Sequence, residues 1–439
     1  MEFTEVLEKD YKTVVTEQVE NGSTDGSRKH LLFINQHYYP DVAATGQYLT
    51  DLCEYLTNRG HEVTVLCSQG HYLSGRQDVE ADEMRNGVHI LRVPATSFGR
   101  ASHYKRLIDY ASFLLLTLWY SLFRITRPDT VVCLTTPPLL GLVGYLIRTF
   151  RKSDYMIWSM DLHPEAEKAL GMLPPSRIFK KFLFRLGKFI YQKSDHVISL
   201  GPEMTRQVKN YPVEALRVSE IPIWADKEEI RYFAENDCVP DKIPRFPKNR
   251  FIVNYSGNVG LVHDLEALQD VMMALKNDPE IFFLFTGGGP QVGKLKKFVR
   301  THQIRNVDFQ DYVEREDLSC ALARADLHWF SLKLSCSGIA VPSKSVGYMA
   351  SGIPQLFLGD ITADNAQTIR RAGCGYVVHP QKTEEAVAVI REMKDNADLR
   401  SEMGRHGRHY FENHLEKQLL CDRWHQLLTN TGVDVKVNL

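Results

Sequence analysis

Short, nearly continuous apolar runs alternate with helical patterns along most of this chain. The runs are rich in Val, Ile, Leu and Phe, which is typical of strands covered on both faces. They form two series, at residues 31–35, 62–67, 88–93, 130–134, 155–160 and 196–200, and then at 251–255, 281–285, 307–309, 327–330, 355–358 and 376–378. The pattern predicts an α/β protein made of two halves, each with a parallel sheet.

The segments around these runs predict two domains and a linker. Residues 1–29 are polar and acid-leaning, which indicates a loose N-terminal extension. A stretch rich in proline and charge begins near residue 221 and ends at 248, and it is the best linker candidate. We therefore place the N-terminal domain at 30–221 and the C-terminal domain at 222–407. A final helix at about 408–432 is expected to pack back on the first domain.

Composition and charge narrow the class of protein. The 439 residues are 44% hydrophobic and 24% charged, as in ordinary globular proteins, and this length suits two or three domains. The 53 Lys and Arg residues nearly balance the 54 Asp and Glu residues, so the formal net charge is −1. We therefore expect no nucleic acid as partner, since there is no global basic excess.

Cysteine usage and the lack of a secretory signal pattern predict a cytoplasmic protein. The chain has 8 cysteines and no C-x-x-C pair, so we expect buried free thiols and no zinc site. The longest apolar stretch, residues 111–123, is shorter than the ~20 residues that a membrane-spanning helix needs.

Small or glycine-rich turns follow three of the predicted strands, where ligands bind in α/β proteins. The first turn includes Gly46, ahead of a helical stripe that ends near residue 58; a small residue lets a ligand approach the backbone. The others are YSGNVG at 255–260 and FTGGGP at 285–290. The first turn does not match the G-x-G-x-x-G dinucleotide fingerprint, and it also suits a plain strand-to-helix turn.

The sequence VPSK at residues 341–344 predicts a helix start that binds an anion. Pro342 suits the first turn of a helix, which would then also hold Ser343 and Lys344. Backbone N–H groups, a hydroxyl and an ammonium would converge there, and a phosphate suits this set best. The alternative is a helix cap with a solvated lysine.

The sequence MDLHPE, residues 160–165, follows another predicted strand. Asp161 and His163 would place a carboxylate and an imidazole at the carboxyl edge of the sheet, where they can contact a substrate. The alternatives are an Asx turn for Asp161 and a surface imidazole for His163.

The order of these segments resembles the GT-B-fold glycosyltransferases of family 4, in particular the bacterial exopolysaccharide and O-antigen transferases. The matching segments, from residue 31 to about 428, are QHYYPDVAATGQY, RGHEVTVLCS, TTPPLLG, SMDLHPE, YSGNVG, FTGGGP, DYV, VPSKSVGYMASGIP and GCGYVVHP. The resemblance implies two Rossmann-like α/β/α domains that face each other across a cleft.

The resemblance also implies a nucleotide-sugar donor on the C-terminal domain, an acceptor on the N-terminal domain, and retention of anomeric configuration. It implies no cofactor and no obligatory metal. By motif position, the residues expected to bind the sugar donor are Gly46, Asn258, Gly288, Val313, Ser343 and Lys344.

Particular roles follow from the same resemblance. Ser343 and Lys344 would contact the diphosphate, and Gly46 would let the first loop approach it. Val313 would flank the base through its backbone. Asp161 would lie near the transferred sugar, and we take Asp161, His163 and Lys344 as the candidate catalytic residues.

Two departures from the family pattern concern the same site. Most members carry two glutamates eight residues apart, and those positions hold Ile339 and Gly347, so the usual ribose-binding carboxylate is missing. The arginine that normally follows YSGNVG is replaced by Leu261. Cationic stabilisation of the leaving diphosphate would therefore fall largely on Lys344.

A basic segment lies within the nearly neutral chain. Residues 168–194 contain seven basic residues and no acid, and Arg177, Lys181, Arg185 and Lys188 share one helical face. One interpretation is a domain helix whose apolar side is core. The other is a surface that docks on anionic lipid, with each basic residue contributing about 1 kcal/mol.

The sequence thus predicts a retaining, metal-independent glycosyltransferase that acts on a membrane-associated glycan, such as a polyprenyl-linked acceptor, in cell-surface polysaccharide biosynthesis. We expect it on the inner face of the membrane as a peripheral protein. Two alternatives stay open. One is a nucleotide-sugar epimerase of the same fold, and the other is a catalytically degenerate partner subunit of a glycosyltransferase.

Overall fold

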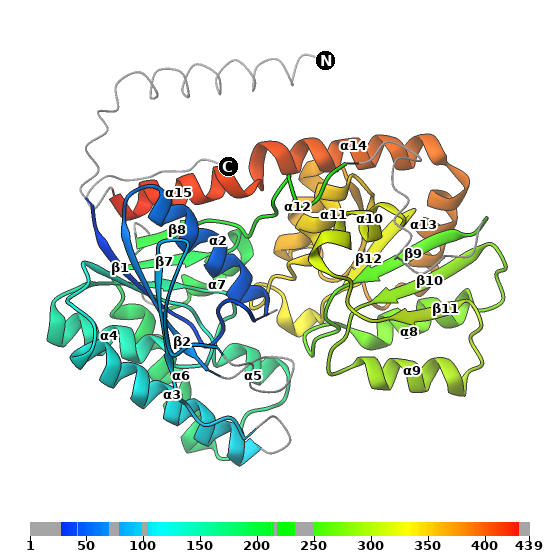
Figure 1. The fold of residues 1–439 in the computed structure, drawn as a ribbon. Helices are drawn as coiled ribbons and strands as arrows, with labels where there is room; N and C mark the ends of the chain where they lie inside the picture. Colours follow the sequence, from blue (N-terminus) through cyan, green and yellow to red (C-terminus); the bar gives the residue numbers. More distant parts are fainter. Residues whose placement is uncertain are drawn as a thin grey trace.

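The computed structural model describes residues 28–41, 43–69, 79–98, 103–211, 213–214, 217–232 and 249–429. Two α/β halves lie side by side, and a pair of C-terminal helices extends from the second half over the first (Figure 1). Nearly all of the expected N-terminal extension lies outside the described residues, as do Cys238 and the part of the expected linker from 233 to 248.

Eight strands form the sheet of the first half, in the order β3-β4-β2-β1-β5-β6-β7-β8. Their bounds are β1 (His30–Ile34), β2 (Glu62–Ser68), β3 (Asp82–Arg85), β4 (Val88–Val93), β5 (Thr130–Cys133), β6 (Asp154–Trp158), β7 (His196–Ser199) and β8 (Val218–Glu220). The six predicted strands are confirmed, and β3 and β8 are additional. The expectation of a wholly parallel sheet is wrong at its edge, because β3 pairs antiparallel with β4 as a short hairpin.

Six parallel strands form the second sheet, in the order β11-β10-β9-β12-β13-β14. Their bounds are β9 (Phe251–Ser256), β10 (Ile281–Thr286), β11 (Val307–Gln310), β12 (Leu327–Ser331), β13 (Gln355–Leu358) and β14 (Gly375–Val378). All six were predicted as strands, so the α/β class and the division into two sheets are confirmed.

Helices fill the connections of both halves. In the first half they are α2 (Ala44–Asn58), α3 (His103–Phe123), α4 (Gly141–Arg151), α5 (Glu165–Ala169), α6 (Arg177–Gln192) and α7 (Pro202–Val208). In the second half they are α8 (Leu265–Ala274), α9 (Val292–Thr301), α10 (Leu318–Ala323), α11 (Lys344–Ser351), α12 (Asp364–Ala372), α13 (Thr383–Asp395) and α14 (Ala397–His414), with 3-10 turns at η2 (Arg315–Asp317) and η3 (Leu334–Cys336). The last helix is α15 (Lys417–Thr429).

The helices α14 and α15 run across the top of both halves in Figure 1. The end helix α15 packs on α2, where Arg59 and Asp422 form an ion pair of 2.6 Å. Three buried tryptophans meet close to where α15 packs on the first half. The ring of Trp158 on β6 lies 5.8 Å from that of Trp224 and 4.7 Å from that of Trp424 on α15. Aromatic contacts therefore join the N-terminal half, the start of the connection and the C-terminal helix.

Among the cysteines that the structure describes, the prediction of free thiols is wrong at one position. The free and buried thiols are Cys53, Cys67, Cys133, Cys336, Cys374 and Cys421. Cys320 is disulfide-bonded, so the expectation of a free thiol is wrong there. A disulfide depends on which chain segments the fold brings together, and spacing along the sequence gave no sign of this one.

No helix in the described part of the chain is both long and apolar enough to cross a membrane. The apolar stretch that the sequence singled out lies within α3, a helix of 21 residues.

Candidate active site

The two glycine-rich loops of the second half lie against each other at the carboxyl ends of β9 and β10. The backbone N–H of Val259 donates to the carbonyl of Gly288 at 2.7 Å, and that of Gly257 donates to Thr286 at 2.8 Å. Gly289 has a φ of +124°, and a Cβ there would lie 2.2 Å from Asn258 Oδ1. Only glycine permits this approach of one loop to the other.

Lys344 meets the first of these loops. Its Nζ donates to the carbonyl oxygen of Asn258 at 2.8 Å and lies 5.1 Å from the centroid of the Tyr255 ring. A Cβ on Gly257 would stand 3.5 Å from Lys344 Cε. The structure therefore brings Asn258 and Lys344 together, and their roles in donor binding stay predictions.

The start of α11 differs slightly from the prediction. The helix begins at Lys344 with Ser343 as its N-cap, so Pro342 precedes the first turn instead of forming part of it. The carbonyl of Pro342 accepts a hydrogen bond of 3.0 Å from Asn365 Nδ2, outside the helical pattern. Ser343 and Lys344 still lie where free N–H groups begin the helix.

His263 is a neutral partner of Lys344. Its Nδ1–H donates to the carbonyl of Ser331 at 2.5 Å, which leaves Nε2 as an acceptor 3.3 Å from Lys344 Nζ. Burial, with the nearby charge of Lys344, lowers the pKa of His263 to about 3. His263 therefore supplies no positive charge in place of the arginine expected near Leu261.

Lys344 carries the positive charge at this site, and its environment makes its protonation sensitive to pH and to bound anions. Burial lowers the pKa of Lys344 from 10.5 to about 7, so near neutral pH the amine is only partly protonated. An anion bound beside Nζ would favour the charged form and raise the pKa again. Proton uptake by Lys344 is therefore linked to anion binding.

Gly288 and Val313 border one end of the same edge. A Cβ on Gly288 would lie 2.9 Å from Cε2 of Tyr312, whose side chain is 46% exposed. Val313 follows Tyr312 just after β11. An exposed aromatic ring thus stands over the second glycine-rich loop, where a planar base could stack.

The first half reaches the same helix through α2. Gly46 lies in the first turn of α2, and a Cβ there would be 3.2 Å from the carbonyl carbon of His37. Two residues further along, the hydroxyl of half-buried Tyr48 hydrogen-bonds to Ser343. Tyr48 thus joins α2 to the start of α11 through a contact that the sequence did not reveal. The approach of Gly46 to the diphosphate stays a prediction.

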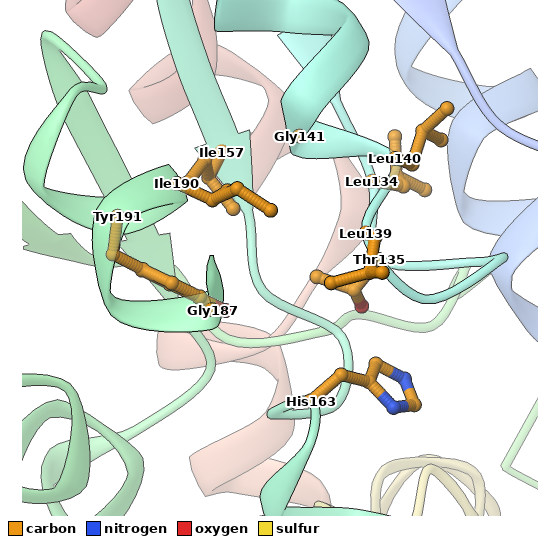
Figure 2. Close-up of a pocket in the computed structure, with 10 residues that line it drawn as sticks. All are labelled: Leu134, Thr135, Leu139, Leu140, Gly141, Ile157, His163, Gly187, Ile190 and Tyr191. Atoms are coloured by element: carbon orange, nitrogen blue, oxygen red, sulfur yellow. The ribbon is translucent and has the colours of Figure 1, made fainter. Parts of the chain in front are cut away.

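Asp161 and His163 lie on the loop after β6, beside an apolar pocket. The pocket is lined by Leu134, Thr135, Leu139, Leu140, Gly141, Ile157, His163, Gly187, Ile190 and Tyr191. Figure 2 shows His163 at one end, apart from the apolar side chains, with the hydroxyl of Thr135 facing it. Thr135 Oγ1 accepts hydrogen bonds from the backbone N–H groups of Met160 and Asp161, at 3.2 and 3.1 Å. Thr135, which the sequence analysis did not single out, therefore fixes the loop that carries Asp161.

The side chains on this loop form a charged set. His163 Nδ1 lies 2.8 Å from Glu167 Oε1. Burial lowers the pKa of His163, but the hydrogen bond and charge of Glu167 outweigh it, so the pKa is raised overall. Burial raises the pKa of Asp161. His163 is therefore an ion-paired imidazole instead of a solvated surface residue.

A short segment of the second half, residues 339–340, connects the loop of Asp161 and His163 with the site around Lys344. The backbone N–H of Leu162 donates to the carbonyl of Ile339 at 3.0 Å, and Asp161 forms an isolated bridge with Ala340. That segment leads directly to Ser343 and Lys344. The loop of Asp161 thus contacts the segment that leads into α11, the helix predicted to bind a phosphate.

Ile339 and Gly347, which stand where the family usually has glutamates, make a backbone hydrogen bond and an apolar contact. The carbonyl of Ile339 is occupied by Leu162, and a Cβ on Gly347 would stand 3.6 Å from Cδ1 of Ile230. In the described part of the chain, no group of three or more His, Cys, Asp or Glu side chains could hold a metal ion.

Two family models match most of the chain. The model for the glycosyl transferase 4-like domain matches residues 44–224, and the model for glycosyl transferases group 1 matches residues 240–410. Two α/β domains with parallel-strand sheets are characteristic of the GT-B fold. The chain belongs to the GT-B glycosyltransferases of family 4.

Similar proteins support this assignment. The chain is 26% identical over 276 residues to the probable glycosyltransferase WbjE of Pseudomonas aeruginosa, covering 63% of this chain and 68% of that protein. It is 23% identical over 402 residues to the putative colanic acid biosynthesis glycosyl transferase WcaI of Escherichia coli, covering 88% and 97%.

Solved structures share the fold at lower identity. Sucrose-phosphate synthase from Thermosynechococcus elongatus superposes with a TM-score of 0.73 at 16% identity, covering 91% of this chain and 98% of that one. Anabaena HepE in complex with UDP-glucose superposes with a TM-score of 0.67 at 12% identity, covering 92% and 100%. The two-domain GT-B prediction is thereby confirmed.

Proposed function

We propose that this glycosyltransferase transfers a sugar, with retention of anomeric configuration, from a nucleotide-sugar donor to a lipid-linked glycan in cell-surface polysaccharide biosynthesis. The observation that carries the proposal is Lys344: from the start of α11 its amine contacts the first glycine-rich loop, which itself packs on the second. That arrangement suits a diphosphate, because charge, backbone N–H groups and room for close approach coincide.

The sugar donor would bind to the second half. Ser343, Lys344 and the first N–H groups of α11 would hold the diphosphate. Gly288, Tyr312 and Val313 would border the base, with Gly46 approaching from the first half. HepE, which shares this fold, was solved with UDP-glucose, which supports a nucleotide sugar as ligand.

In the proposed reaction, the bond between the anomeric carbon and the diphosphate oxygen breaks as the acceptor oxygen bonds to the same face of the sugar. The acceptor proton passes to the departing phosphate oxygen. Lys344 and the helix N–H groups stabilise the negative charge on the diphosphate. Asp161 would hold the transferred sugar, and no enzyme nucleophile or metal ion takes part.

The acceptor would bind to the first half, beside Asp161 and His163. The helix α6 packs directly on this loop, since a Cβ on Gly187 would lie 2.9 Å from Cδ of Pro164. The name of WcaI places it in colanic acid biosynthesis, which supports a polysaccharide glycan as the acceptor.

The proposal is tested with a panel of nucleotide sugars, first in a thermal-shift assay and then with an undecaprenyl-diphosphate-linked glycan as acceptor. We expect one nucleotide sugar to raise the Tm, and its sugar to appear on the lipid with unchanged anomeric configuration by NMR. Turnover of the nucleotide sugar without acceptor, giving an epimer, would favour an epimerase. Binding of no nucleotide sugar would favour a degenerate partner subunit.

Exposed apolar and basic side chains on α3 and α6 suggest how the protein would meet a lipid-linked acceptor. On α3, Leu107, Leu115 and Trp119 are 62%, 69% and 48% exposed, and they recur at multiples of four residues. On α6, Ile178 and Phe182 are 85% and 55% exposed. Because these side chains are exposed, the apolar faces of α3 and α6 are only partly core. Both helices lie along the lower edge of the first half in Figure 1.

Basic residues accompany this apolar surface. Arg177, Lys181, Arg185 and Lys188 are all exposed on α6. Apolar side chains that enter the headgroup region, with cations beside them, are typical of peripheral binding to anionic membranes. The proposed location is therefore the inner face of the membrane, with α6 carrying the acceptor loop towards the lipid.

Replacing both Arg177 and Lys181 with glutamine is expected to weaken binding to anionic vesicles about 30-fold, at about 1 kcal/mol for each charge. Binding to neutral vesicles should not change. The measurement is co-sedimentation with phosphatidylglycerol-containing and pure phosphatidylcholine vesicles. A matched control replaces the exposed Lys294 and Lys297 of α9 with glutamine, which should leave binding intact. Equal losses in the two variants would contradict a basic docking face on α6.

A further inference from the structure

One helix of the first half is held by a carboxylate from the second half. The backbone N–H of Glu203 donates to Asp364 Oδ1 at 2.7 Å, and that of Met204 donates to Oδ2 at 3.2 Å. Both groups belong to the first turn of α7, whose N–H groups have no partner within the helix. Asp364 opens α12 and is buried, so the carboxylate is committed to this contact.

The fit around α7 is tight on two sides. Gly201 has an extended backbone that any residue could adopt, yet a Cβ there would lie 2.5 Å from Asp364 Oδ1. On the other side, a Cβ on Gly338 would lie 2.7 Å from Cγ of Glu203. We call this contact, made by Gly201, Glu203 and Met204 with Gly338 and Asp364, the α7 clasp.

The clasp is connected to the phosphate helix by the residue after Asp364. Asn365 is buried, and its Nδ2 donates to the carbonyl of Pro342 at 3.0 Å. Pro342 immediately precedes Ser343 and Lys344. The other end of the same segment, at Gly338, touches α7 directly. The segment from 338 to 342 is thus held at one end by the clasp and at the other by Asn365, the residue after Asp364.

A pocket beside the clasp shows why this contact matters for the alignment of the two halves. A pocket borders the clasp on the side of the C-terminal helices, with Gly201, Asp364, Asn365, Tyr410 and Arg423 in its lining. The two halves are not packed continuously at this pocket, so the clasp acts beside other contacts between them, such as the hydrogen bond from Leu162 N–H to the Ile339 carbonyl. A carboxylate that accepts two N–H groups fixes both distance and orientation across such a junction.

We propose that Asp364 and Asn365 are positioning residues for the transfer reaction: they seat the first half on the second so that the loop of Asp161 stands opposite Lys344. This inference rests on the proposed function only for its catalytic consequence. The sugar donor binds to the second half, so loss of the clasp should impair transfer more than nucleotide binding. Reacting groups misplaced by about 1 Å can lose about 100-fold in rate.

The test is Gly201→Ala, which inserts a methyl group against the Asp364 carboxylate without straining the backbone. We expect kcat to fall about 10- to 100-fold, with the Kd for UDP within twofold of wild type. Gly293→Ala is the matched control, because no atom lies within 4 Å of the added Cβ, and it should keep the wild-type kcat. Asp364→Asn keeps one side-chain oxygen for Glu203 and should retain more activity than Asp364→Ala.

Small-angle X-ray scattering separates this inference from the proposed function, since it needs no activity. We expect the radius of gyration of folded Gly201→Ala, checked by its Tm, to exceed those of wild type and Gly293→Ala. If the wild type transfers no sugar, the proposed function fails and scattering alone decides the clasp. The positioning role is wrong if Gly201→Ala keeps the wild-type radius of gyration. It is also wrong if this variant keeps the wild-type kcat, or loses kcat and UDP affinity by the same factor.

Discussion

Replacing Lys344 with alanine is expected to lower turnover about 100- to 1000-fold, the loss typical when one preorganised partner of a developing negative charge is removed. Lys344 Nζ is held 2.8 Å from the Asn258 carbonyl, and neutral His263 supplies no second charge. The amine therefore has no cationic substitute in its immediate contacts. Steady-state kinetics with saturating acceptor measures the effect.

The same variant should not lose stability in the absence of ligand. The pKa of Lys344 is lower in the folded protein than in the unfolded chain, so at neutral pH the unfolded chain binds more protons. Burying the ammonium thus opposes folding, and this penalty is largest below pH 7 and fades as the pH rises towards 10. The Tm of Lys344→Ala at pH 6.5 should equal or exceed that of wild type.

An exposed lysine provides the comparison. Lys294→Ala, on the surface of α9, should change neither turnover nor Tm. If Lys344→Ala turned over sugar at the wild-type rate, the assignment of the diphosphate site would be wrong. If it lost activity only because it unfolded, circular dichroism and the Tm would reveal it.

Nucleotide affinity is expected to fall about tenfold for each pH unit above 7 until the pKa of Lys344 in the complex is reached. The reason is that burial places the pKa of Lys344 at about 7 in the free protein, while a bound diphosphate favours the protonated amine. Above pH 7 the terminal phosphate of UDP is almost fully ionised, so its own titration contributes little.

Isothermal titration calorimetry with UDP between pH 6.5 and 9, in buffers of different ionisation enthalpy, measures this coupling. Uptake of nearly one proton per UDP is expected at pH 8.5, well above the pKa of about 7 of the free amine. In Lys344→Arg the guanidinium stays charged throughout, so both the slope and the proton uptake should vanish. A flat affinity profile for the wild type would show that the lysine does not face the diphosphate.

The sequence predicted the strands well wherever both faces of a strand are covered. The run FIVNYS of β9 is apolar enough to be read directly, because it is buried between helix layers. The strand β3 reads Asp-Glu-Met-Arg, alternates between exposed and half-buried, and lies at the edge of its sheet, so its pattern resembles that of a loop. Its pairing depends on β4, which the sequence of β3 alone does not encode.

The candidate site was predictable for a topological reason. Loops that follow parallel strands emerge at one edge of a sheet, so Asn258, Gly288 and Lys344 were bound to be near one another. The low pKa of Lys344 was not predictable, because it depends on how closely three separate segments pack around the amine. The contact of Tyr48 with Ser343 and that of Asp364 with α7 join residues of different domains, and no local pattern records such pairs.

The tryptophans beneath the crossing helices give this protein an internal optical signal. Three of the five tryptophans in the chain, Trp158, Trp224 and Trp424, meet where the connection to the second half and α15 pack on the first half, and energy transfer and quenching among neighbouring indoles vary with their separation. A fourth, Trp119, stands on the exposed face of α3. Movement of the connection or of α15 on the first half, and entry of α3 into lipid, would therefore change different parts of one emission spectrum, and Trp119→Phe would separate them without any attached dye.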